Sequence, residues 1–305
     1  MKRLALLSAA FAALQLYSNA KAGDRSFDNS RFPSLEEIKP LPPSALDGLQ
    51  PSFFHDVILS VEGNYSYLEH RDGQPARLRA ESTGVNIGLS TGFGGVGFAA
   101  VRGSFSTYQM NSRVVEFPLD LVADAYARDI DAVVGFNPLP FLRLGAIGGI
   151  GNGDATYAFA ANPGGSDSDS TGKRLGGFIG GFYPVGPVLF SADVSYLAIW
   201  NDQSYAPTNN PPRASWDSEL MTLTLGADYQ AMPDLTLWGK ASFNHILSQT
   251  VAPADTPNDT NWMALQLGAT YALSDKIDLK VSGLTWAGNS KFNYSRISAG
   301  MNYRF

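Results

Sequence analysis

Apolar and polar residues alternate one by one over most of the chain after residue 53. The last eleven residues show this clearly, because Ile297, Ala299, Met301, Tyr303 and Phe305 alternate with polar or small residues. Successive side chains of a β-strand point to opposite faces, so the alternation predicts strands with one apolar and one polar face. Twelve such segments are predicted, at residues 54–68, 78–92, 96–109, 123–137, 141–159, 173–184, 188–202, 215–231, 235–249, 260–273, 277–287 and 291–305.

The connectors between these segments alternate between short and long. The short ones are at residues 93–95, 138–140, 184–187, 232–234 and 274–276. The others are mostly longer and more polar, at residues 69–77, 110–122, 160–172, 203–214, 250–259 and 288–290. Short periplasmic turns and longer extracellular loops are typical of up-and-down membrane barrels, which have an even number of antiparallel strands in bacteria. We therefore expect both termini of the barrel on the periplasmic side.

The first 53 residues do not continue the alternating pattern. Lys2 and Arg3 precede an apolar stretch that ends at Leu16, and the small residues Ala20 and Ala22 follow. This order predicts a signal peptide over residues 1–22, because the stretch is shorter than the roughly 20 residues of a spanning helix. Residues 23–53 contain five prolines, which disfavour a strand. They are predicted to be a periplasmic arm or a plug inside the lumen, and the barrel is predicted to cover residues 54–305.

The composition agrees with a membrane barrel. Charged residues make up 16% of the chain, against roughly 25% in typical soluble domains. No segment after residue 22 approaches 18 uninterrupted apolar residues, and a closed barrel is the spanning structure other than a helix. The chain has no cysteine, which excludes thiolate metal ligands and cysteine nucleophiles, and its net charge of −6 argues against a nucleic-acid partner.

The C-terminal segment resembles the last strand of Gram-negative outer-membrane β-barrel proteins, which ends on an aromatic residue, usually Phe. That strand is recognised by the barrel-assembly machinery, so the resemblance makes Tyr303 and Phe305 the assembly signal of this chain. It implies an all-β fold: an up-and-down antiparallel transmembrane barrel of about 12 strands, porin-like, in contact with outer-membrane lipid and lipopolysaccharide. The resemblance covers residues 54–305 and identifies a class without a subfamily.

The positions opposite the apolar face would point into the lumen, and they include charged residues. The acids are Asp56, Glu62, Asp129, Asp131, Asp193, Asp228 and Asp278, and the bases are Arg102, Arg143, Arg174, Lys240, Lys280, Arg296 and Arg304. Charges this far from bulk water are solvated by pore water or paired with opposite charges. Equal numbers of acids and bases therefore allow either a water-filled channel or a closed, salt-bridged interior.

Two other features of the sequence resemble sites with a chemical function. The run from Gly148 to Gly153 looks like a phosphate loop, but no helix pattern follows it, so its glycines are predicted to relieve crowding or to permit a bend. His245 falls on the lipid face, with Glu219 and Asn261 expected nearby, as in a hydrolytic relay. Ser218 and Ser248 have inward parity, so no nucleophile is expected beside this histidine.

Aromatic residues near the segment ends are predicted to form two belts at the membrane interfaces. Tyr108, Trp262 and Trp286 belong to the predicted outer belt.

The expected function is a passive channel for ions or small polar solutes. A structural or surface-interaction barrel with a closed lumen is one alternative, and an outer-membrane lipid hydrolase is another. We expect no enzyme activity, cofactor or metal, because nothing resembles the zinc, nicotinamide or nucleotide motifs. Secretion of an attached domain is disfavoured, because only residues 23–53 separate the predicted signal peptide from the first strand.

Overall fold

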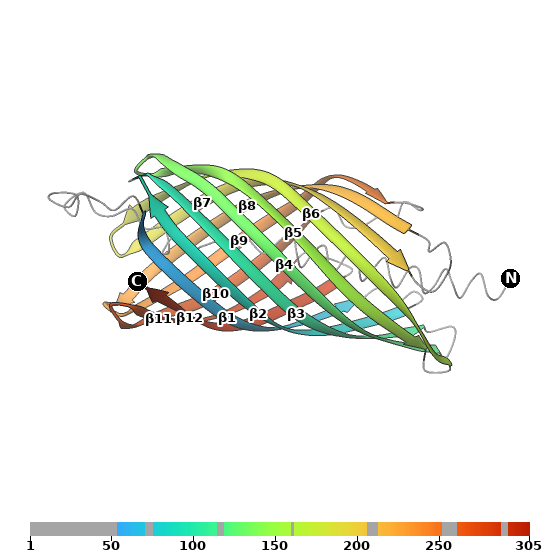
Figure 1. Ribbon diagram of the computed structural model, residues 1–305. Helices are drawn as coiled ribbons and strands as arrows, with labels where there is room; N and C mark the ends of the chain where they lie inside the picture. The colour runs from blue at the N-terminus through green and yellow to red at the C-terminus, as the bar shows by residue number, and fades with distance from the viewer. Residues whose placement is uncertain are drawn as a thin grey trace.

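The computed structural model describes residues 54–70, 76–94, 96–114, 119–159, 162–205, 213–251, 261–287 and 292–305. These residues form twelve antiparallel strands that close into one barrel (Figure 1). The strands are β1 (Phe54–His70), β2 (Ala76–Phe93), β3 (Gly97–Val114), β4 (Leu119–Leu139), β5 (Leu142–Phe159), β6 (Asn162–Val185), β7 (Val188–Tyr205), β8 (Arg213–Met232), β9 (Leu235–Val251), β10 (Asn261–Ser274), β11 (Ile277–Ala287) and β12 (Phe292–Arg304). The predicted fold class is confirmed. Residues 1–22 and 23–53, predicted as signal peptide and arm, lie outside the described residues.

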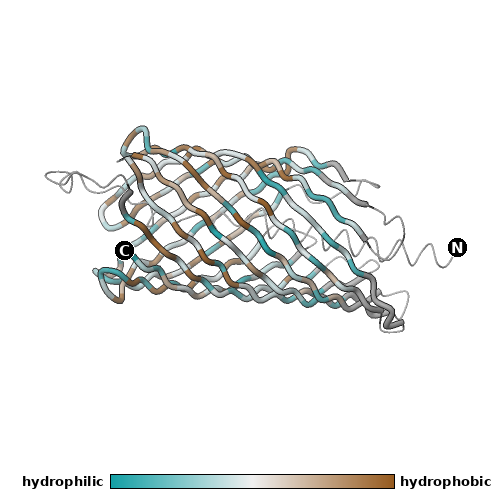
Figure 2. Tube along the Cα trace, in the orientation of Figure 1, coloured by the Kyte–Doolittle hydropathy of each residue, from teal (hydrophilic) through white to brown (hydrophobic). Residues whose placement is uncertain are grey.

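The alternating sequence places apolar side chains on the outside of the barrel. In β2, Val85, Ile87 and Leu89 are 46%, 54% and 50% exposed, whereas Asn86 between them is 7% exposed. Figure 2 shows the same alternation of hydrophobic and hydrophilic residues along the strands around the wall. An exterior this apolar suits hydrocarbon rather than water. Among the described residues, no helix is long and apolar enough to cross a membrane.

The barrel closes where the first strand pairs with the last. Val61 of β1 lies opposite Met301 of β12, and Glu62 lies opposite Gly300. The backbone N–H of Phe305 donates to the carbonyl of Val57 at 3.1 Å, which continues the pairing to the last residue. Closure leaves neither strand with an unpaired edge along this seam.

The predicted short connectors at residues 138–140, 184–187, 232–234 and 274–276 are confirmed as tight turns, whereas residue 95 of the connector at 93–95 lies outside the described residues. Gly186 adopts a φ of +58° in the turn between β6 and β7, a left-handed conformation that glycine accepts without steric cost. The short turns lie at one end of the barrel, which we call the turn end, and the opposite end is the loop end. β1 begins and β12 ends at the turn end, because the two strands are antiparallel neighbours.

Two of the predicted long loops are wrong over most of their length. Within residues 110–122, β3 continues to Val114 and β4 starts at Leu119, and within residues 160–172, β6 starts at Asn162. Backbone pairing continues there through polar residues. The strands are therefore longer than the segments of apolar alternation from which they were predicted. The wall is consequently uneven, since β6 has 24 residues and β11 has 11 (Figure 1).

The closure of the barrel can be tested with a pair of cysteines, since the chain has none of its own. We expect Val61→Cys with Met301→Cys to form a disulfide on mild oxidation, because these residues are partners across the seam. The measurement is the shift in electrophoretic mobility of the unfolded protein with and without reductant.

Val61→Cys with Ile297→Cys is the matched control, because Ile297 lies opposite Tyr65 instead. Equal cross-linking of both pairs, or of neither, would contradict the register at the seam.

Candidate functional site

Ion pairs inside the barrel span three strands and pass over a glycine on the middle one. Asp131 of β4, Gly149 of β5 and Arg174 of β6 lie in one row of the sheet. Arg174 Nε donates to Asp131 Oδ1 at 2.5 Å, although strands two apart are roughly 9.5 Å from each other. A Cβ atom at Gly149 would collide with both the Asp131 and the Arg174 side chains. The glycine therefore makes room for this ion pair.

The same arrangement occurs one strand further along the wall. Arg143 of β5 and Asp193 of β7 both lie opposite Gly180 of β6. Arg143 Nε and Nη2 donate to Asp193 Oδ1 at 2.9 and 2.7 Å, and the guanidinium carbon lies 5.8 Å from the ring centroid of Phe178. A Cβ atom at Gly180 would collide with the Asp193 carboxylate. The prediction that glycines relieve crowding is thus supported at Gly149, and Gly180 adds a position that the sequence did not single out.

At least four of the seven predicted lumen acids form ion pairs with predicted bases. Asp131 also lies 3.8 Å from Arg102 Nη2, and Asp129 Oδ1 lies 3.5 Å from Arg174 Nη1. Near the turn end, Arg304 Nη2 donates to Asp278 Oδ2 at 2.5 Å. These contacts bring together predicted residues that lie far apart in the sequence.

The other predicted lumen residues lie elsewhere on the wall. Glu62 accepts a hydrogen bond from Asn86 Nδ2 at 3.1 Å. Arg296 is buried, and Asp228, Lys240 and Lys280 are half-buried. Asp56 differs from all of these, because it is exposed, has a φ of +52° and lies at a bulge between His55 and Ile58. Strand parity therefore does not hold at Asp56, and an electrostatic role for the fourteen residues stays a prediction.

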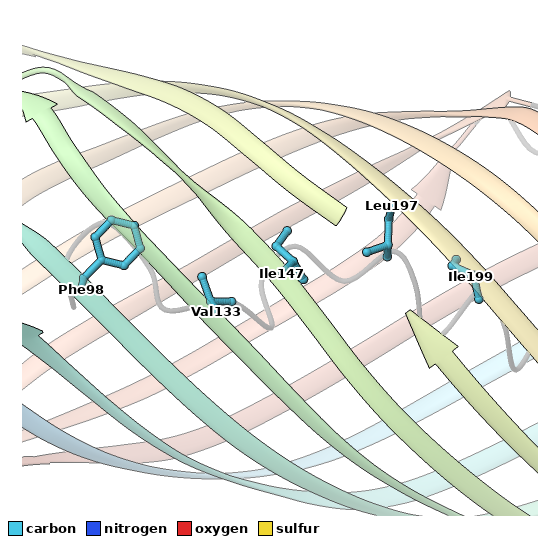
Figure 3. Close-up of a cluster of buried hydrophobic side chains, with 5 residues drawn as sticks. All are labelled: Phe98, Val133, Ile147, Leu197 and Ile199. Carbon is cyan, nitrogen blue, oxygen red and sulfur yellow. The ribbon is translucent and has the colours of Figure 1, made fainter. Parts of the chain in front are cut away.

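A band of buried apolar side chains runs beside the ion pairs. Figure 3 shows its members, which are Phe98, Val133, Ile147, Leu197 and Ile199. Phe178 packs against this cluster. An apolar neighbourhood lowers the local dielectric and so strengthens the adjacent ion pairs. This apolar band was not predicted from the sequence. Val133 nevertheless lies on the same face of its strand as Asp131, and Ile147 lies on the same face as Gly149.

Three aromatic side chains pack against one another, with tilted rings, inside the barrel near the loop end. The ring centroids of Trp262 and Trp286 are 5.8 Å apart, and those of Trp286 and Tyr294 are 4.8 Å apart. Trp262 and Tyr294 are only 5% and 6% exposed. The placement of Trp262 and Trp286 in a lipid-facing belt was therefore wrong, because their parity matches the inward-facing residues of the same strands. Tyr108 was misplaced as well, because it lies opposite the buried Ser82.

A cavity of about 90 Å³, lined largely by polar residues, occupies the opposite side of the lumen. Its lining comes from β1, β2 and β3 and from β9 to β12, and includes Arg102, Lys240, Lys280 and Glu62. The ammonium group of Lys240 lies 5.5 Å from the ring centroid of Trp238, which also lines the cavity. In the described interior, most of the printed ion pairs and the buried apolar band thus lie on β4 to β7, whereas the cavity lies on the other side, which also carries the Asp278–Arg304 pair.

His245 lies on the outer face with an amide partner. Its Nδ1 is 2.6 Å from Asn261 Oδ1, as the sequence suggested, while Glu219 contacts Tyr196 instead. The inward placement of Ser248 was wrong, because a bulge in β9 reverses its parity and leaves it exposed opposite Glu219. In the described chain no hydrogen bond joins Ser248 to His245, so the nucleophile contact of a hydrolytic relay is not formed.

A closed barrel with an apolar exterior and a charged interior defines a transmembrane β-barrel. The profile of the outer membrane protein beta-barrel domain family matches residues 142–305, and the chain belongs to this family. Both the family and the fold are those of the bacterial outer membrane.

Solved structures with this fold include transport units of autotransporters. The translocator domain of NalP from Neisseria meningitidis matches with a TM-score of 0.72 and 11% identity, over 94% of this chain and 98% of that chain. The transport unit of AIDA-I from Escherichia coli matches with a TM-score of 0.61 and 10% identity, over 86% and 94%. The beta domain of Bordetella BrkA matches with a TM-score of 0.60 and 13% identity, over 82% and 100%. At these identities the similarity shows the fold alone, and no curated protein sequence matches the chain.

The role of the glycine beneath the central ion pair can be tested by adding one methyl group. We expect Gly149→Ala to lower the free energy of unfolding by about 1–3 kcal/mol, because the new Cβ must displace Asp131 or Arg174. The measurement is urea unfolding of the lipid- or detergent-folded barrel, followed by tryptophan fluorescence.

Gly103→Ala is the matched control, because a Cβ atom there meets nothing within 4 Å. Equal losses of stability in the two variants would contradict the proposed spacing role of Gly149.

Proposed function

We propose that this barrel is a passive channel for small polar solutes in the bacterial outer membrane. The observation that carries the proposal is the polar cavity along seven strands of the lumen wall. Charged and hydroxyl side chains line it, including Arg102, Lys280, Ser282 and Ser298. Such a surface replaces the water that a polar solute gives up on entering a narrow pore.

The ion pairs favour this function over a wholly closed, structural lumen. They are concentrated on the β4 to β7 wall, where Asp131 and Arg174 are bonded to each other and Asp193 to Arg143. Because they are bonded to each other, these side chains lie against the β4 to β7 wall. The opposite wall retains the cavity, so the charges of the interior do not all meet across the lumen.

The orientation of the barrel and its contacts follow from the same proposal. The turn end would face the periplasm and the loop end the exterior, where lipopolysaccharide would surround the wall. The assembly machinery would recognise Tyr303 and Phe305 on the outer face. Their rings meet edge to face at 5.0 Å. Phe305 is 71% exposed and thus accessible to a partner, whereas Tyr303 is half-buried.

Channel activity is tested by single-channel recording of the refolded barrel in planar bilayers at two salt concentrations. We expect discrete, reproducible current steps whose size increases with salt, because water and ions would occupy the polar side of the lumen. Heat-modifiable migration in gels provides the control for folding. A correctly folded barrel that gives no current steps would reject the channel.

Translocation of an attached passenger segment is a second candidate function. The observation that favours it is the match to the NalP translocator domain over nearly the full length of both chains. In this case residues 23–53 would run through the lumen as the predicted plug, and their N-terminal end would reach the cell surface.

An epitope inserted after Gly23 separates the two candidates. We expect the epitope to stay inaccessible to antibody on intact cells if the barrel is a channel with a periplasmic arm. Surface labelling of intact cells, with a periplasmic marker protein as the control for leakage, would favour translocation instead.

A further inference from the structure

We infer that three of the short turns lie within the bilayer, where lipid acyl chains cover an apolar rim at the turn end. The rim consists of Val96 at the β2–β3 turn, Leu139 and Phe141 at the β4–β5 turn, and Val185 at the β6–β7 turn. Its partner is the hydrocarbon of the leaflet at this end. The inference does not depend on whether the barrel conducts.

The rim is as exposed as the lipid-facing wall. Val96, Leu139, Phe141 and Val185 are 56%, 46%, 54% and 51% exposed. Phe136, the last outward-facing residue of β4 before its turn, is exposed as well. The rim therefore continues the apolar exterior of the barrel beyond the ends of the strands, and an apolar surface of this kind calls for an apolar partner.

The five short turns differ in charge. The β2–β3, β4–β5 and β6–β7 turns contain no charged residue, whereas Asp234 lies in the β8–β9 turn and Asp275 and Lys276 lie in the β10–β11 turn. Turns in water are usually polar. The apolar turns are consecutive around the barrel, so one arc of the turn end suits lipid and the other suits water.

The backbone of the apolar turns has few donors that need water. Proline has no N–H group, and the turns contain Pro138, Pro140, Pro184 and Pro187. Neighbouring segments also satisfy one another, because the N–H of Asn137 donates to the carbonyl of Val96 at 2.8 Å and that of Phe182 donates to the carbonyl of Phe141 at 3.0 Å. Backbone groups paired in this way can enter hydrocarbon at low cost.

The apolar stretch on the outside of β4 is too short to span the hydrocarbon without its turn. Arg128 is exposed on the outer face, and a charge there is tolerated only near the edge of the hydrocarbon. From Ile130 to Phe136 the outer face is apolar. At about 3.3 Å per residue and a tilt of about 40°, this stretch spans only about 18 Å of a band that is about 25 Å tall. Leu139 and Phe141 supply the missing height.

On the other arc the strands are long enough by themselves. The outer face of β10 is apolar from Met263 to Leu273, which by the same geometry spans about 28 Å. The charged residues Asp275 and Lys276 follow directly. The apolar band is therefore shifted toward the turn end on β4, and the turns between β2 and β7 lie deeper in the lipid than those between β8 and β11.

Fluorescence quenching at single cysteines tests the depth of the turns, since the chain has no cysteine of its own. Leu139→Cys, Val185→Cys and Asp275→Cys are labelled with a polarity-sensitive fluorophore and folded into phosphatidylcholine vesicles. We expect nitroxide groups on the acyl chains to quench the labels at Leu139 and Val185 more strongly than the label at Asp275. Iodide on both sides of the bilayer should quench them in the opposite order, because an ion does not enter hydrocarbon.

Ile87→Cys in the wall is the control for full exposure to lipid, since Ile87 is exposed on the outside of β2. Heat-modifiable migration in gels verifies folding, and Phe141→Cys replaces a rim variant that does not fold. Iodide quenching at Leu139 and Val185 as strong as at Asp275 would overturn the inference. Protection of these labels from both quenchers would also overturn it, and would indicate contact with a second copy of the chain instead.

Discussion

Hydrocarbon offers no hydrogen-bond partner to a peptide group, so a chain that spans it must satisfy its own backbone. The seam between β1 and β12 meets this requirement, because it leaves no strand edge open around the barrel. Closure also fixes the two faces of every strand. Apolar residues such as Ile87 lie outside, and each polar or charged residue on the inner face must find its partners within the lumen.

The lumen meets that demand differently on its two sides. Along β4 to β7, arginine and aspartate pair next to the buried side chains of Val133 and Ile147. Around β12 and β1, hydroxyl, amide and lysine groups face a cavity instead. The equal numbers of acids and bases in the sequence say nothing of this division, because it depends on which strands carry them.

The sequence predicted the even number of strands and the tight turns between them. Both follow from local features, namely the apolar alternation and turn residues such as Gly186. The loops predicted at residues 110–122 and 160–172 were wrong over most of their length, because strand pairing continues there where apolar alternation has stopped. Ser248 was misplaced because a single bulge reverses parity and leaves no mark in the sequence. Trp262 was misplaced because an aromatic near a strand end was assigned to the interface without regard to its parity. The partner of Asp131 depends on the alignment of three strands, which a single sequence does not reveal.

The row formed by Asp131, Gly149 and Arg174 also bears on how the wall assembles. A slip of β5 by one residue would exchange its faces. It would replace Gly149 between the two charged side chains by Gly148 if β5 slipped in one direction, and by Ile150 if it slipped in the other. The bulk of Ile150 would separate the ion pair and leave two charges without compensation in an apolar setting. The row therefore disfavours the slip that brings in Ile150, because the ion pair needs the observed register of β4, β5 and β6.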